Sequence, residues 1–220
     1  MGHIPHLYVL PPWEASFLPL TELQHHHLHR VLRLEDHAPV SYTDGRGAVG
    51  TGTLGPQGIR RGNESQMPRP SPALTVAVAP PHASDRARFI VEKLGELGVE
   101  RVLWMISDFG QARAPRTDKS AQWAIGALEQ SRGAWLMSIE VDVALRELPL
   151  PIWVVQPGGG PLPAPTGDVT LVVGPEGGFS PEELSRADTT VGLGARVLRV
   201  ETAAVVASAL VLHHLGRMNT

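Results

Sequence analysis

One stretch, residues 169–202, restricts the fold of this chain more than any other, because an apolar strand runs directly into a glycine loop and a helix start. The run Val169–Val173 is short, rich in β-branched residues and bounded by Gly and Pro, which predicts a fully buried strand. The glycines of the following loop, Gly174–Phe179, permit positive φ and a close approach to the backbone. Ser180 and Glu183 have the spacing of a capping box, so a helix is expected to begin at once.

A second glycine turn follows closely. The chain continues with a short strand near Thr190–Leu193, the turn Gly192–Gly194 and the basic segment Arg196–Arg199, before a final apolar helix, Thr202–Leu215. Two glycine loops this close in sequence are able to form two walls of one pocket. Either loop alone is equally consistent with an ordinary turn of an α/β sheet. The pair, followed by Arg-x-x-Arg-x-Glu-Thr, favours a pocket.

The rest of the C-terminal part alternates strands and helices. The further expected strands are 74–79, 102–106 and 152–155, and the further expected helices are 84–97 and 119–136. Ser84 is expected to cap the first of these helices and Gly98 to end it. Strands that alternate with helices indicate an α/β fold with a parallel sheet covered on both faces.

The N-terminal part has a different pattern. It is rich in Pro, Gly and His, with expected strands at 7–10, 40–43 and 48–54 and one helix at about 20–32. Short strands joined by turns predict a small β-barrel. The segment Gly55–Pro72 has the composition of a linker or an exposed hairpin end. We therefore expect two domains, 1–72 and 73–220.

Composition excludes several classes of protein. The chain has no cysteine, so disulfides and cysteine-based metal sites are excluded. His25 and His29 have the spacing of a helical metal site, but no carboxylate stands at a suitable offset, and we expect no metal. No signal peptide and no apolar run of membrane-spanning length are recognisable, so a soluble, cytoplasmic protein without membrane contact is expected. With a net charge of −3, any nucleic-acid binding must come from a local patch.

The motifs resemble those of a known family. GPEGG followed by S-x-E-E and then by LGxRVLRxETA is similar to the signature of the bacterial 16S ribosomal RNA (uracil-N3)-methyltransferases, which belong to the SPOUT superfamily. Weaker similarities cover residues 29–34, the helix FIVEKLGELGVERV and the element Glu129–Ser131. The resemblance implies S-adenosylmethionine (SAM) as methyl donor and a uridine of the decoding region of 16S rRNA as target, in an assembled 30S subunit. It also implies a homodimer, a C-terminal SPOUT domain with a deep trefoil knot and an N-terminal PUA-like barrel that binds RNA.

Site residues follow from these motifs. Arg199 and Arg196 are candidates to hold phosphate or to stabilise the uracil oxygens as N3 loses its proton, and Glu201 is a candidate general base. The alternative for both arginines is a structural ion pair with Glu176 or Glu201, and Glu201 is also suited to the first turn of the last helix. In the barrel, Arg30 and Arg33 are the expected RNA-binding residues. The expected cofactor-binding residues are Gln156, Pro157, Gly174, Pro175, Glu176, Gly177, Gly178, Leu193, Gly194, Val197, Leu198 and Thr202.

The chain also departs from the family. The family tends to carry arginines where this chain has His3 and His6, a lysine in place of Ala83, and an arginine near Phe109. A SPOUT enzyme acting on a ribose 2′-hydroxyl or a tRNA, and a catalytically silent RNA-binding protein, therefore stay open as alternatives. A dinucleotide-dependent enzyme is disfavoured, because no G-x-G-x-x-G follows the first expected strand of the C-terminal part, 74–79.

Overall fold

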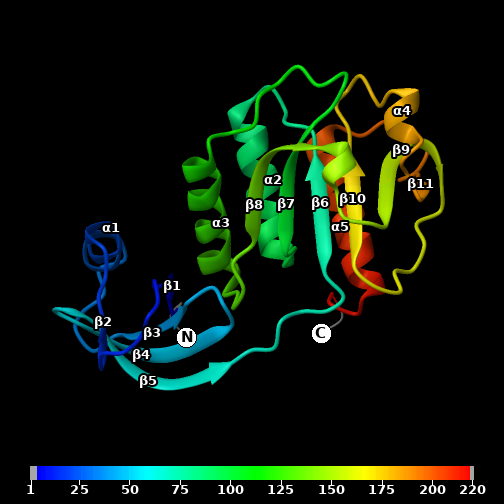
Figure 1. Ribbon diagram of the computed structural model, residues 1–220. Helices are drawn as coiled ribbons and strands as arrows, with labels where there is room; N and C mark the ends of the chain where they lie inside the picture. The colour runs from blue at the N-terminus through cyan, green and yellow to red at the C-terminus, as the bar shows by residue number, and fades with distance from the viewer. Residues whose placement is uncertain (1–3, 219–220) are drawn as a thin grey trace. The chain divides into compact units, whose positions relative to one another are not determined.

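The computed structural model describes residues 4–218, which form two compact units (Figure 1). The first contains the residues up to Arg69 together with Leu128–Leu136. The second contains Pro70–Ala127 together with the residues from Met137 onward. No helix among the described residues has the length and apolar composition needed to cross a membrane.

The first unit is built on a curved, mixed sheet with the strand order β1-β3-β4-β5-β2. Its strands are β1 (His6–Tyr8), β2 (Phe17–Leu18), β3 (Pro39–Thr43), β4 (Ala48–Gly55) and β5 (Gly58–Gln66). β1 pairs with β3 in parallel, and the other neighbours are antiparallel. Leu28, Tyr42 and Ile59 are buried in its core. This arrangement agrees with the expected barrel-like domain.

Two expectations for this unit need correction. The stretch Gly55–Pro72 is not simply a linker or hairpin end, because β5 occupies nine of its residues and pairs with β4. The expected single helix is two short ones, α1 (Glu22–His26), capped by Thr21, and the π-helix η1 (His27–Val31). Most side chains of β5 are partly or fully exposed, so the strand is defined by backbone pairing and carries no apolar alternation.

The second unit is a six-stranded parallel sheet with the order β11-β9-β10-β6-β7-β8. Its strands are β6 (Leu74–Val78), β7 (Arg101–Ile106), β8 (Ser138–Ala144), β9 (Ile152–Gly160), β10 (Val169–Val173) and β11 (Thr189–Val191). The helices and the 3-10 turn are α2 (Ser84–Leu97), α3 (Thr117–Ser131, which continues into the first unit), η2 (Leu145–Glu147), α4 (Pro181–Leu184) and α5 (Val200–His214). Every residue of β6 and β10 is buried, as expected for central parallel strands. α5 packs against α2, β6 and β10.

Some of the helix starts and ends that the sequence predicts in this unit agree with the structure, and others do not. Gly98 ends α2 in the left-handed conformation, with a φ of 80°, and Ser180 and Glu183 form the capping box of α4. The N-cap of α2 is Ala83 rather than Ser84, without a side-chain cap bond. The helix expected to reach residue 136 ends at Ser131, because Arg132 adopts a φ of 57°. β8, which is only partly buried, was not predicted.

Candidate active site

A cavity of about 320 Å³ lies at the carboxyl end of β10, where ligands of parallel sheets commonly bind, and beside residues 155–157 in the middle of β9. The loop after β10 forms one wall, and the second glycine turn with the start of α5 forms another. All the expected cofactor-binding residues except Thr202 line it: Gln156, Pro157, Gly174, Pro175, Glu176, Gly177, Gly178, Leu193, Gly194, Val197 and Leu198. The structure thus brings the two glycine loops together around one space.

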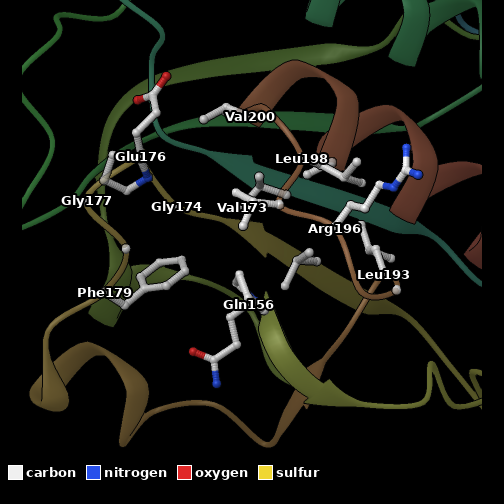
Figure 2. A pocket seen from close by; sticks show the side chains of 17 residues that line it. Gln156, Val173, Gly174, Glu176, Gly177, Phe179, Leu193, Arg196, Leu198 and Val200 are labelled. Atoms are coloured by element: carbon white, nitrogen blue, oxygen red, sulfur yellow. The ribbon is translucent and has the colours of Figure 1, made fainter.

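The expected cofactor-binding residues include only part of the apolar lining of this cavity. Five further residues contribute to it: Val155, Val173, Phe179, Val200 and Ala203. Figure 2 shows Val173 from β10, Phe179 from the loop and Val200 from α5 around the cavity. Val155 and Val173 stand at the expected strand ends, which is a signal that points to a cavity wall. The positions of Val200 and Ala203 depend on how α5 packs.

At three positions around the cavity the structure explains why the residue is glycine. A Cβ at Gly174 would lie 2.6 Å from the Phe179 ring, so only glycine lets this ring pack against the end of β10. Gly178 and Gly194 have φ values of 76° and 110°, in the region that glycine favours. Apart from the adjoining residues of the chain, no atom lies within 4 Å of the place that a Cβ would take at either residue. The backbone at both loops is therefore open to a ligand.

A polar network fixes the loop that follows β10. The buried carboxylate of Glu183 accepts hydrogen bonds from the backbone N–H of Ser180 at 2.8 Å and from that of Asp108 at 3.1 Å. Asp108, just after β7, accepts a further bond from the Ser180 hydroxyl at 2.5 Å. The loop after β7 and the loop after β10 are thereby held together next to Phe179.

The expected catalytic residues are not all at this cavity. Arg196 lines it, whereas the exposed Arg199 is the N-cap of α5 and does not. Glu201 forms an ion pair with Arg86 of α2 at 3.7 Å, and one of its carboxylate oxygens is buried without a hydrogen-bond partner. Among residues 4–218, neither Arg196 nor Arg199 forms an ion pair, so the expected pairing with Glu176 or Glu201 is absent there. Thr202 is exposed in the first turn of α5.

A second cavity, of about 480 Å³, adjoins the first and shares Pro175, Glu176 and Gly177 with it. Its other residues come from the loop after β6 and the loop after β7: Pro80, His82, Asp108, Phe109, Gln111 and Ala112. Glu176 lines both cavities. The Phe109 side chain is exposed over half of its surface.

The expected RNA-binding arginines lie in the first unit. Arg30 is exposed in η1, but Arg33 stands beyond the end of this helix with a φ of 54°, so the two do not share a helix face as expected. Arg30 lines an open cavity together with His25 and His29, whose rings are 4.3 Å apart. Within the described part of the chain, no group of three or more His, Asp or Glu residues is arranged to hold a metal ion.

Of the two histidines that replace family arginines, His3 lies outside the described residues. His6 is buried in β1, with ring nitrogens 2.9 Å from the Ser41 hydroxyl and 3.1 Å from the carbonyl oxygen of Gly133. Burial lowers the pKa of His6, and the nearby charge of Arg132 lowers it further. His6 is therefore a neutral structural residue near pH 7 rather than a contact for phosphate.

Residues 68–152 and 156–212 match the RNA methyltransferase domain family, which is more than half of the chain. The chain belongs to this RNA methyltransferase family. A relative, the ribosomal RNA small subunit methyltransferase E of Rickettsia conorii, is 26% identical in an alignment of 226 positions that covers 90% of each chain. The resemblance seen in the motifs is confirmed at the level of the family.

Solved structures similar to this RNA methyltransferase cover nearly its whole length. A probable rRNA-methyltransferase from Porphyromonas gingivalis has a TM-score of 0.85 and 26% identity, over 97% of this chain and 99% of its own. A putative methyltransferase from Legionella pneumophila, solved with bound SAM, has a TM-score of 0.84 and 24% identity, over 96% of this chain and 98% of its own. Both units of the fold therefore recur together in other proteins.

Proposed function

We propose that this RNA methyltransferase transfers a methyl group from SAM to N3 of a uridine in the decoding region of 16S rRNA. The observation that carries the proposal is the cavity at the carboxyl end of β10 in which both glycine loops of the family-like motifs meet. The relatives support it, because one is named a ribosomal RNA small subunit methyltransferase and another was solved with SAM.

The residues of the first cavity fit SAM. Its volume of about 320 Å³ lies in the range of small-molecule sites. Val155, Val173 and Leu198 offer an apolar surface for the adenine ring, and the open backbone at Gly178 and Gly194 offers polar groups to the ligand edge. When bound, SAM supplies a methyl group that is already activated on a positively charged sulfur.

The chain must position uracil N3 and help its proton leave. Glu176 lines both cavities, which suits it to accept the N3 proton. Arg196, which lines the same cavity, is suited to stabilise with its guanidinium the negative charge that spreads onto the uracil oxygens. Arg199 adds a second cation at the start of α5. Glu201, held by Arg86, supports α5 rather than serving as the base.

The proposal extends to assembly. We propose a homodimer that buries the exposed apolar face of α5, a trefoil knot in the domain 73–220, and a PUA-like domain 1–72 that contacts RNA through Arg30 and Arg33. The substrate is 16S rRNA within the 30S subunit in the cytoplasm. Neither a metal nor a membrane takes part in this reaction.

Calorimetric titration with SAM tests the cofactor site. Leu198→Trp would fill part of the first cavity, so we expect at least about a tenfold loss of SAM affinity. The control is Leu150→Trp, a change at a residue that is 70% exposed and does not line the cavity. Equal SAM affinity of both folded variants would remove the assignment, and SAM binding without methylation of 30S subunits would favour a silent RNA-binding protein.

A further inference from the structure

The second cavity contains an exposed aromatic side chain that core packing does not explain. Phe109 is 50% exposed and stands in a tight turn directly after β7, where the N–H of Gly110 donates to the carbonyl oxygen of Ser107 at 2.9 Å. A half-exposed Phe gains little from folding. Its ring is instead available at the wall of the cavity.

The turn that carries Phe109 is held rigidly. Asp108, its neighbour, accepts a hydrogen bond from Ser180 at 2.5 Å and donates its backbone N–H to Glu183 at 3.1 Å. Both partners belong to the capping box of α4. The ring is therefore presented from a braced backbone, which reduces the entropy lost when a ligand stacks on it.

The same turn touches the wall shared by the two cavities. A Cβ placed on Gly177 would lie 3.1 Å from the Cβ of Phe109, so the two loops are in close contact. Gly177 and Glu176 line both cavities. A planar group on Phe109 would therefore lie beside a ligand of the first cavity.

We propose that the second cavity binds the acceptor pyrimidine of the RNA, turned out of its stack and placed on the ring of Phe109, with the Gln111 amide facing its polar edge. An enzyme that modifies a base must extract that base, and aromatic side chains commonly receive it by stacking. The Gln111 amide has both donors and an acceptor, which match the carbonyl and N–H groups of uracil. This assignment rests on the proposed function and adds the residues that bind the acceptor.

Steady-state methylation of 30S subunits separates this role from a structural one. Loss of one stacking contact in Phe109→Ala is expected to lower kcat/KM about tenfold or more, while SAM affinity stays unchanged. Phe109→Trp retains a stacking surface and is expected to keep most of the activity. Phe89→Ala, on α2 and also partly exposed, is the matched control without effect. Equal activity of Phe109→Ala and Phe89→Ala would overturn the proposal.

Photocrosslinking tests the site even if 16S rRNA is not the substrate. 4-Thiouridine 5′-monophosphate is irradiated with protein saturated with S-adenosylhomocysteine, and the adducts are mapped by mass spectrometry. We expect the main adduct at residues 109–111, its suppression by excess uridine monophosphate, and its loss in Phe109→Ala. Adducts elsewhere, or none, would overturn the acceptor site, whereas adducts here without methylation of 30S subunits would contradict only the proposed substrate.

An exposed Phe also occurs where subunits meet, and light scattering distinguishes the two roles. If Phe109 stacks on RNA, Phe109→Ala keeps the molar mass of the wild type. A lower mass in this variant would assign Phe109 to a protein interface and contradict the proposal.

Discussion

Two carboxylates near the first cavity differ in their surroundings, which separates their proposed roles. Glu176 is exposed to both cavities, whereas Glu201 is largely buried and paired with Arg86 at 3.7 Å. A general base needs access to the proton that it accepts. The geometry therefore favours Glu176 over the residue that the sequence motif first suggested.

Glu176→Gln removes this proposed base with little change in volume. We expect the single-turnover rate of 30S methylation to fall by about a hundredfold, within the usual contribution of general bases, while SAM affinity changes by only a few fold. Glu201→Gln is the control, and a smaller loss is expected because it alters support of α5. A larger loss in Glu201→Gln would reverse the two assignments.

Arg196 and Arg199 are distinguished in the same way. Only Arg196 lines the first cavity, so Arg196→Ala is expected to lower the single-turnover rate by about a hundredfold, as when one stabilising donor is removed. Arg196→Lys should restore little, because an ammonium does not reproduce the planar guanidinium. We expect a smaller loss in Arg199→Ala. If Arg199→Ala loses more, the charge stabilisation belongs to the N-cap residue of α5.

His6 makes the stability of the first unit dependent on pH. Because burial holds its pKa below 6.5, the unfolded state takes up the proton first as the pH falls. The stability from neutral His6 is thus fully present above pH 6.5 and is lost as the pH falls through the lower, folded-state pKa. We expect His6→Gln to flatten the pH dependence of denaturant unfolding in this range. His26→Gln, a change at an exposed site, is the control. If His6→Gln unfolds with the same pH dependence as the wild type, the linkage between His6 and stability is contradicted.

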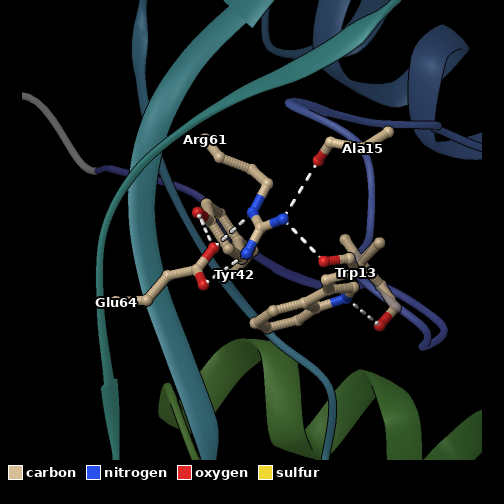
Figure 3. A network of polar contacts seen from close by, with 6 residues as sticks. Trp13, Ala15, Tyr42, Arg61 and Glu64 are labelled. Atoms are coloured by element: carbon tan, nitrogen blue, oxygen red, sulfur yellow. Dashed lines mark hydrogen bonds and ion pairs between the residues drawn. The ribbon is translucent and has the colours of Figure 1, made fainter.

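Among the secondary-structure elements, β5 is a strand that the apolar pattern of the sequence does not reveal. Arg61 on this strand donates to the Glu64 carboxylate at 2.7 Å and also to the carbonyl oxygens of Trp13 and Ala15. Figure 3 shows these four residues together. Tyr42 donates to the same carboxylate at 2.8 Å, and burial raises the pKa of Tyr42 to about 12. These polar side chains fasten the strand to a distant segment. Hydrophobic periodicity cannot predict a strand held in this way.

The central strands of the parallel sheet, unlike β5, were predictable because their residues are apolar. Val169–Val173 and Leu74–Val78 are buried along their whole length, so their composition alone indicates central strands. The glycine loops beside them indicated the first cavity. The second cavity was not predicted, because Phe109 and His82 are brought to Glu176 only by the order of strands in the sheet.

The exposed apolar residues of α5 lead us to predict a homodimer. Val206 and Leu210 are 36% and 42% exposed and lie four residues apart on one face of this helix. We expect light scattering to give twice the chain mass of 23.6 kDa for the wild type, and a double Val206→Glu, Leu210→Glu variant to be monomeric. Leu150→Glu, at another exposed apolar residue, should leave the mass unchanged. A stable wild-type monomer at micromolar concentration would rule out this dimer.

At the scale of the whole molecule, the two units divide the proposed task. The parallel sheet carries both cavities, and the barrel-like unit carries Arg30 and the histidines of its open cavity. Since the net charge is −3, selectivity for RNA must come from the placement of these groups. We therefore predict one modified position rather than general methylation of RNA.

Mass-spectrometric mapping of 16S rRNA tests whether this protein methylates N3 of a uridine in the decoding region. Ribosomal RNA is compared from cells that contain this protein, cells that lack it, and cells that carry only Glu176→Gln. We predict a single uridine in the decoding region that bears one methyl group on N3 in the first sample and none in the other two. A methyl group on a ribose hydroxyl, a modified tRNA in its place, or identical 16S rRNA in all three samples would contradict the account.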